Sequence, residues 1–146
     1  MSKAIVSKLN SLVADFTVFY QKLRHYHWNV KGPRFFILHQ KFEEIYDEIN
    51  LVIDELAERI VGLEGVPLHT LAHVLEEASL QEDPNIPDGE AMVAALVSDM
   101  TALTKSLQSA LEEAEDAEDR TTVNMLDEVK DGLEAHIWML KAWEGK

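Results

Sequence analysis

Glycine and proline occur at only a few points in this chain, and they divide it into long segments. The six glycines and four prolines lie mostly in three clusters. Between the clusters, apolar residues recur at the three- and four-residue spacing of an amphipathic helix, and no alternating strand pattern appears. The sequence therefore predicts an all-α protein with long helices over Val6–Lys31, Phe35–Val61, Asp88–Glu115 and Asp119–Trp143.

A long connection separates the second of these helices from the third. It contains a short helical segment over Thr70–Ala78, with Thr70 as the expected N-cap, and then a proline-containing loop over residues 81–89. The first and last connections are short. A long crossover between the second and third helices is typical of the ferritin-like four-helix bundle. We therefore expect residues 1–146 to form a single ferritin-like domain.

The composition limits the possible function classes. The formal net charge is −14, and such a surface repels the phosphates of DNA unless a basic patch is segregated. The chain contains no cysteine, which excludes disulfides and thiolate metal sites. Its sequence also lacks a signal-peptide layout, an apolar run long enough for a membrane span, a glycine-rich phosphate loop and a serine nucleophile elbow. These features favour a cytoplasmic protein that attracts cations.

The second predicted helix carries apolar residues on two faces. One stripe suits the core of the chain's own bundle, and it consists of Leu38, Phe42, Ile45, Ile49, Val52, Leu56, Ile60 and Leu63. A second strip consists of Tyr46, Ile53, Ala57 and Val61. The remaining, solvated face is assigned to Glu44, Glu48, Glu55 and Arg59. Because one core needs only one stripe, the second strip predicts burial against another subunit; a wide core within the chain is the alternative.

Potential metal ligands border the second strip. His39 and Glu43 lie four residues apart and therefore on one helix face, and Asp54 and Glu58 repeat that spacing. About 22 Å of helix separates His39 from Asp54, so the two pairs cannot share an ion within one chain. Two copies of the helix packed antiparallel across a two-fold axis would bring the pairs together and form two identical sites. His27 joins His39 through the short turn between the first two helices.

The resulting donor set contains two imidazoles and two or three carboxylates. Nitrogen and oxygen donors of this kind suit Fe(II), and also zinc or manganese. A metal site that is shared between chains and keeps free coordination positions favours iron oxidation over a purely structural role for the metal. Carboxylate di-iron bundles that bind metal within one chain use Glu-x-x-His pairs, and no such pair occurs in this sequence.

Three stretches of the sequence carry a resemblance to a known family. They are HWNVKGPRFFILHQKFEEIYDE from His27, DELAERI from Asp54 and HIWMLKAW from His136. Together they closely resemble the Dps mini-ferritins, and the match covers essentially the whole chain. The resemblance implies a hollow homododecamer that oxidises Fe(II) at inter-subunit ferroxidase sites, preferably with hydrogen peroxide rather than oxygen. It further implies storage of ferric Fe(III) mineral, protection against oxidative stress and no organic cofactor.

The resemblance also assigns individual residues. His27, His39, Asp54 and Glu58 match the ligand positions of the family. Glu43 falls where many members carry Asp, and it is assigned as a further metal ligand with a longer side chain. Alternatively, the carboxylates are simply solvated or paired with basic side chains.

Trp28 matches a family tryptophan beside the site that takes up oxidising equivalents, with a packing role as the alternative. The other histidines are placed outside the site. His25 points to the opposite side of the first helix, and His136 is expected to be a buried, hydrogen-bonded core residue. His69 and His73 have a spacing that can bind metal, but we expect them to lie at the surface or in an interface.

DNA binding in the family usually depends on a lysine-rich terminal tail. Here the ends of the chain carry only Lys3 and Lys8, and Lys141 and Lys146. With the net charge, this disfavours DNA binding. A nucleoid protein that protects DNA by coating it is the alternative function, and a purely structural helical oligomer is a third.

Overall fold

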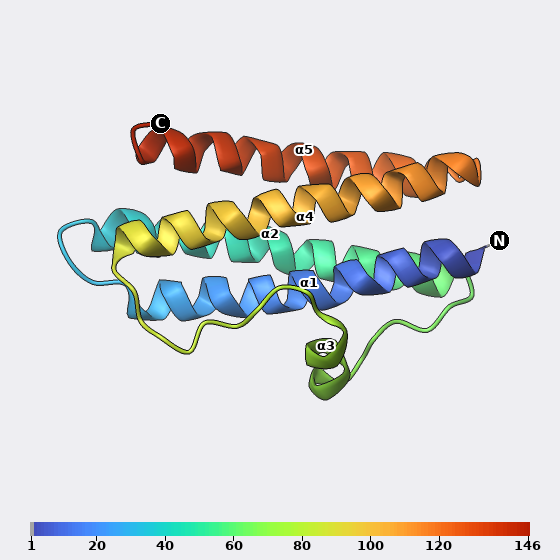
Figure 1. The fold of residues 1–146 in the computed structure, drawn as a ribbon, viewed down its shortest axis with the longest axis horizontal. Coiled ribbons are helices and arrows are strands. Elements are labelled where there is room, and N and C mark those ends of the chain that lie inside the picture. The colour runs from blue at the N-terminus through green and yellow to red at the C-terminus, as the bar shows by residue number, and fades with distance from the viewer. Residues whose placement is uncertain (1) are drawn as a thin grey trace.

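The computed structural model describes residues 2–146 as a bundle of long helices (Figure 1). The elements are α1 (Ser2–Asn29), α2 (Phe35–Gly62), α3 (Leu71–Glu77), α4 (Gly89–Asp116) and α5 (Arg120–Trp143). Every predicted helix is present in the described residues. The largest difference concerns α1, which begins four residues earlier and ends two residues earlier than the periodicity predicts. Its early end fits the turn that follows, because Gly32 has a φ of +107° and Pro33 disfavours helix just before it.

The helices pack as two hairpins joined through α1 and α4 (Figure 1). The short turn joins α1 to α2, and a second short turn joins α4 to α5. The long crossover runs along the outside of the bundle and carries α3, which packs on α1. Val74 of α3 is buried there against Ala14 and Val18. The predicted bundle with one long crossover is therefore confirmed.

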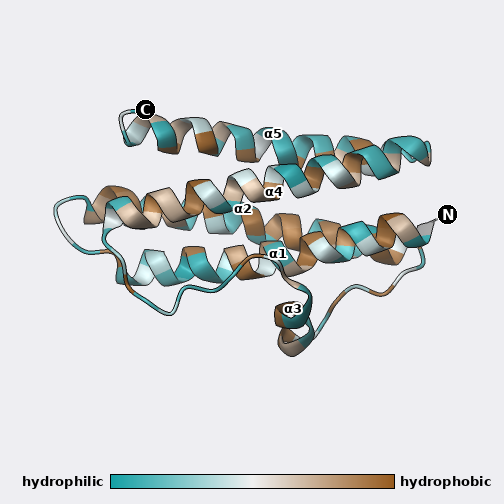
Figure 2. Cartoon of the chain, viewed as in Figure 1, coloured by the Kyte–Doolittle hydropathy of each residue, from teal (hydrophilic) through white to brown (hydrophobic). Residues whose placement is uncertain are grey.

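Apolar and polar residues alternate around the long helices (Figure 2), and the apolar faces meet in the core. Six of the eight residues assigned to the core stripe of α2 are buried: Leu38, Phe42, Ile45, Ile49, Leu56 and Ile60. Val52 and Leu63 are half-buried against the same core. Truncating a fully buried ring such as Phe42 to alanine would cost about 3–5 kcal/mol. No helix among residues 2–146 has the length and apolarity required to cross a membrane.

The second strip of α2 is only partly used within the protomer. Tyr46 and Ile53 are half-buried and pack against the chain's own core. Val61 is 59% exposed, and Leu51 on the same helix is 69% exposed. A wide core therefore explains part of the strip, and burial of the rest against another subunit stays a prediction.

Side-chain caps fix where three helices begin. The Thr70 hydroxyl accepts a hydrogen bond from the backbone N–H of His73, which confirms Thr70 as the cap of α3. Asp88 and Asp119 cap α4 and α5 in the same way, so these helices start one residue after the predicted position. Each cap of this kind is worth about 1 kcal/mol.

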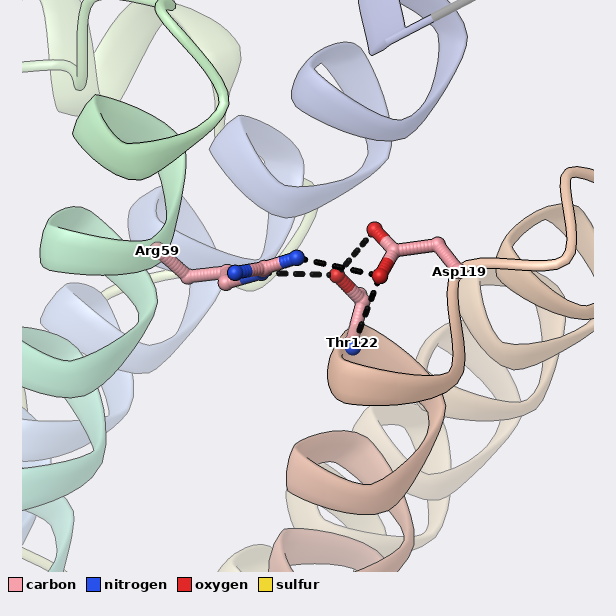
Figure 3. A network of polar contacts seen from close by, with 3 residues as sticks. All are labelled: Arg59, Asp119 and Thr122. Carbon is pink, nitrogen blue, oxygen red and sulfur yellow. Dashed lines mark hydrogen bonds and ion pairs between the residues drawn. The ribbon is translucent and has the colours of Figure 1, made fainter.

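Arg59 is not on a solvated face, and that prediction was wrong. Its Nη2 donates to Asp119 Oδ1 at 3.0 Å and its Nε donates to the Thr122 hydroxyl at 2.9 Å (Figure 3). Burial alone would raise the pKa of Asp119, but hydrogen bonds from Thr122 and the neighbouring guanidinium hold that pKa below its usual value. The contact ties the last turns of α2 to the start of α5.

Candidate metal centre

The turn between α1 and α2 brings His27 against His39. The two imidazole rings stack with centroids 3.7 Å apart and planes inclined by 11°. His27 lies in the last turn of α1, and His39 lies near the start of α2. The proximity predicted from the Gly32–Pro33 break is therefore confirmed.

A reciprocal pair of hydrogen bonds fixes the two rings. Nδ1 of His27 lies 2.6 Å from the carbonyl oxygen of His39, and Nδ1 of His39 lies 2.7 Å from the carbonyl oxygen of His27. A carbonyl oxygen can only accept, so each Nδ1 must carry the proton. In the neutral imidazole this tautomer leaves the lone pair on Nε2, which is the nitrogen available to a metal ion.

Aromatic neighbours hold this imidazole pair in place. The ring of Phe35 stacks on His39 with a centroid distance of 4.8 Å, and the ring of Tyr46 meets that of His27 in a T-shaped arrangement with a centroid distance of 5.3 Å. His27 is only 6% exposed. Glu43 Oε1 lies 3.5 Å from His27 Nε2, so this carboxylate is on the side of the ring that carries the free lone pair. The structure thus brings together three of the five predicted ligands.

The other two predicted ligands form a separate cluster further along α2. Asp54 and Glu58 are both exposed. A hydrogen bond shared with Asp54, together with the charge of Asp54, raises the pKa of Glu58 above its usual value. Two neighbouring carboxylates repel each other, and a bound cation would relieve that repulsion.

Neither cluster is a complete metal site in one protomer. Among the residues that the structure describes, no three His, Asp or Glu side chains converge closely enough to hold a metal ion. We call His27, His39 and Glu43 the imidazole half-site, and Asp54 and Glu58 the carboxylate half-site. The separation matches the expectation from helix length that the halves cannot meet within one chain.

Comparisons with known proteins identify the family. A family model described as the ferritin-like domain matches residues 6–146. The DNA protection during starvation protein of Brevibacillus brevis is 47% identical over 135 residues, which are 92% of this chain and 91% of that protein. This chain belongs to the Dps family.

Solved Dps structures show the same fold. The crystal structure of Dps from Staphylococcus aureus has a TM-score of 0.93 and 42% sequence identity, covering 95% of this chain and 93% of that chain. Dps from Vibrio cholerae O1, described as a member of a broad superfamily of ferritin-like diiron-carboxylate proteins, has a TM-score of 0.95 and 39% identity, covering 97% and 89%. The ferritin-like fold class is confirmed, and membership of the Dps family implies a dodecamer.

DNA protection is part of the name of the Brevibacillus brevis relative. Relatives of this Dps chain therefore give no support to the expectation that DNA binding is disfavoured. That expectation depends on the net charge of −14 and the few lysines near the ends of the chain.

Trp28 of this Dps protein lies at the surface of the protomer. Its indole is 55% exposed and stacks on the guanidinium of Arg24, whose Cζ is 4.9 Å from the ring centroid. Trp28 therefore packs little within the protomer, and both its packing role in the assembly and its redox role stay predictions.

The remaining histidines lie outside both half-sites, as predicted. His25 Nε2 is 2.7 Å from the Asn85 carbonyl oxygen in the crossover. His136 is buried, and its Nε2 is 2.6 Å from Glu48 Oε2, whereas its Nδ1 has no hydrogen-bond partner. Glu48 is exposed, as predicted for the solvated face of α2, and it contacts His136 from there. His69 and His73 are exposed at the surface, and only His73 approaches a carboxylate, with 3.7 Å between its Nε2 and Glu77 Oε1.

The position of Tyr46 beside His27 was not predicted from the sequence. Tyr46 was assigned only to the second apolar strip. The signal was available, because Glu43 and Tyr46 follow His39 by four and seven residues and therefore share its face of α2.

Proposed function

We propose that this Dps protein, with residues 1–146 acting as one domain, oxidises Fe(II) and retains the ferric product as mineral inside its dodecamer. Hydrogen peroxide is the preferred oxidant and oxygen the alternative. The observation that supports this proposal is the division of the proposed ligands, from the end of α1 and along α2, into two incomplete half-sites. One offers imidazole nitrogens with fixed tautomers, and the other offers paired carboxylates.

The two half-sites complement each other if two subunits pack through α2 around a two-fold axis. Antiparallel packing places the imidazole half-site of each copy beside the carboxylate half-site of the other. Exposed Leu51 and Val61 would be covered in such an interface. The dimer would then contain two identical sites, each with two nitrogen donors and up to three carboxylates.

Each group has a distinct role toward the iron substrate. His27 and His39 bind Fe(II) through Nε2; His27 is buried and His39 is half-buried. Asp54 and Glu58 contribute hard, negatively charged oxygens, which neutralise the cation and favour its oxidised state. Glu43 lies close enough to His27 Nε2 to be the fifth ligand. The charge of −14 raises the local concentration of cations around the whole assembly.

A complementation experiment tests the shared site. One variant carries His27→Ala with His39→Ala, and the other carries Asp54→Asn with Glu58→Gln. We expect each variant alone to assemble but to lose peroxide-driven iron oxidation. Random co-assembly should restore about a quarter of the wild-type sites, because half of the dimers are mixed and each mixed dimer regains one intact site.

The outcome is read from the ferric absorbance after Fe(II) and peroxide are added, with the mass of the assembly measured in parallel. Wild-type rates in either variant alone would contradict the ligand assignment. Inactive mixed assemblies of full mass would contradict sharing between subunits.

DNA protection is the second candidate, because it is named in the Brevibacillus brevis relative. A gel-shift titration with duplex DNA at low salt separates the two functions. Strong retention that falls steeply with added salt would favour DNA coating, whereas no retention leaves the iron chemistry as the route to protection.

A further inference from the structure

Tyr46 lies beside the imidazole half-site but is not one of the proposed metal ligands. It is half-buried in the second strip of α2, and its ring makes a T-shaped contact with the buried imidazole of His27. The ring centroids are 5.3 Å apart and the planes are inclined by 84°. A phenol, which can be oxidised by one electron, is therefore packed directly on a proposed iron ligand.

A second tyrosine continues this contact away from the half-site. Tyr20 of α1 meets Tyr46 edge to face, with centroids 5.8 Å apart. The guanidinium of Arg24 then lies 5.3 Å from the ring of Tyr20 and 4.9 Å from that of Trp28. A continuous series of π-systems thus runs from His27 to the exposed indole of Trp28.

The chain contains only three tyrosines, and the third is differently placed. Tyr26 is 1% exposed, and its hydroxyl donates to Asp83 Oδ2 at 2.6 Å. Its aromatic contacts are with His25 and Phe42 rather than with the imidazole half-site. Tyr26 is therefore an internal control for any property assigned to Tyr46.

On the basis of the proposed function, we propose that Tyr46 is a one-electron donor to the reaction of iron with peroxide, and that Tyr20 relays the resulting oxidation outward. Cleavage of the O–O bond of hydrogen peroxide to two waters requires two electrons and two protons. A site that holds one Fe(II) supplies one electron as Fe(III) forms. The Tyr46 phenol supplies the second electron and one proton and becomes a tyrosyl radical, and solvent supplies the second proton.

Without this second electron, a single Fe(II) would convert peroxide to hydroxide and a hydroxyl radical. The proximity of Tyr46 to His27 makes it the first aromatic group able to reduce that oxidant. An electron from Tyr20 would then reduce the Tyr46 radical, which takes a proton from solvent, while the oxidised Tyr20 releases its own proton. The same kind of exchange would move the oxidation toward Trp28 at the surface. Trp28, the residue predicted from the sequence, is in this scheme the end of the path rather than its first member.

Freeze-quench EPR tests the scheme on the intact assembly, with one Fe(II) added per site, followed by peroxide. Ring-deuterated tyrosine, incorporated biosynthetically, distinguishes a tyrosyl from a tryptophanyl signal. We expect a tyrosyl radical in the wild type and in Tyr26→Phe. Tyr46→Phe should lose the early tyrosyl signal and release more hydroxyl radical to a spin trap, although phenylalanine preserves the ring packing.

The ferric absorbance of the same samples separates failure of this inference from failure of the proposed function. A wild type that oxidises iron without a tyrosyl radical would overturn the role of Tyr46 alone. Persistence of the early radical in the Tyr46→Phe variant would do the same. A wild type that does not oxidise iron would overturn both proposals.

Discussion

The imidazole half-site and the carboxylate half-site differ in how far one protomer organises them. In the imidazole half-site, His27 and His39 are stacked, bonded to each other's backbone and enclosed by aromatic rings. In the carboxylate half-site, Asp54 and Glu58 are exposed and repel each other. The first is preorganised by folding, and the second is an exposed pair of carboxylates that a cation would neutralise.

This difference indicates how metal binding and assembly are coupled. The imidazole half-site is already arranged, so little conformational entropy is lost there when a cation binds. The carboxylate half-site contributes more to the free energy of binding, because the cation neutralises two neighbouring negative charges. A ligand that binds across two subunits stabilises their association by mass action. Iron should therefore strengthen the dimer contact chiefly through its effect on the carboxylates.

The largest expected effect comes from His27→Ala. It removes a proposed ligand and leaves the carbonyl oxygen of His39 without its imidazole partner. We expect iron oxidation to slow by more than about tenfold, as for other damaged metal sites. The free energy of unfolding should fall by about 1–3 kcal/mol because a partly buried acceptor loses its donor. Stopped-flow absorbance and urea unfolding measure the two effects.

His69→Ala is the matched control, since this exposed histidine lies outside both half-sites. If His27→Ala and His69→Ala lose equal amounts of iron oxidation and of unfolding free energy, the imidazole half-site has no special role.

A smaller effect is expected from Arg59→Lys, next to the carboxylate half-site. Lysine cannot reproduce the forked contact with Asp119 and Thr122, so the free energy of unfolding should fall by about 1 kcal/mol. Urea unfolding measures this change, with the exposed Arg120→Lys as control. A loss of iron oxidation as large as that of His27→Ala would show that the carboxylate half-site depends on this anchor more than the structure indicates.

The smallest effect concerns the pH dependence of the metal-free protein. The pKa of Glu58 is raised in the folded state, so the folded protein holds that proton more tightly than the unfolded chain. The contribution to stability is complete below the ordinary pKa of about 4.5 and is lost as the pH rises through the raised value. Glu58→Gln should therefore melt at a higher temperature than the wild type at pH 7, with less difference at pH 4.

Thermal unfolding in the presence of a chelator measures this shift, with Glu76→Gln on α3 as the control. If Glu58→Gln raises the melting temperature by the same amount at pH 4 and pH 7, the two carboxylates do not repel each other in the folded state.

The sequence was sufficient where contacts are local. Helical periodicity located the long helices, and the Gly32–Pro33 break was enough to place His27 beside His39. The spacing along α2 correctly separated the carboxylate half-site from the imidazole half-site. These inferences depend on the geometry of one helix or one short turn, which the local sequence determines.

The contacts that were missed join residues far apart in the chain. Arg59 and Asp119 are separated by 60 positions, and Glu48 and His136 by 88. Arg59, Asp119 and Glu48 were each compatible with solvent when judged from their own helix, and His136 was expected to be buried but with no partner assigned. Packing of α5 against α2 decides their partners, and no periodicity within one helix encodes that packing.

The place where α1 ends has a consequence for how the chain can vary. Carbonyl groups in the last turn of a helix have no partner within it, and the carbonyl of His27 uses this freedom to accept from His39. In a longer first helix, the carbonyl oxygen of His27 would accept a backbone hydrogen bond within the helix. The imidazole of His39 would then lose its partner and be free to rotate. Insertions near residues 30–34 should thus abolish iron chemistry while every ligand is retained, which makes the length of this turn as restrictive as the identity of the histidines.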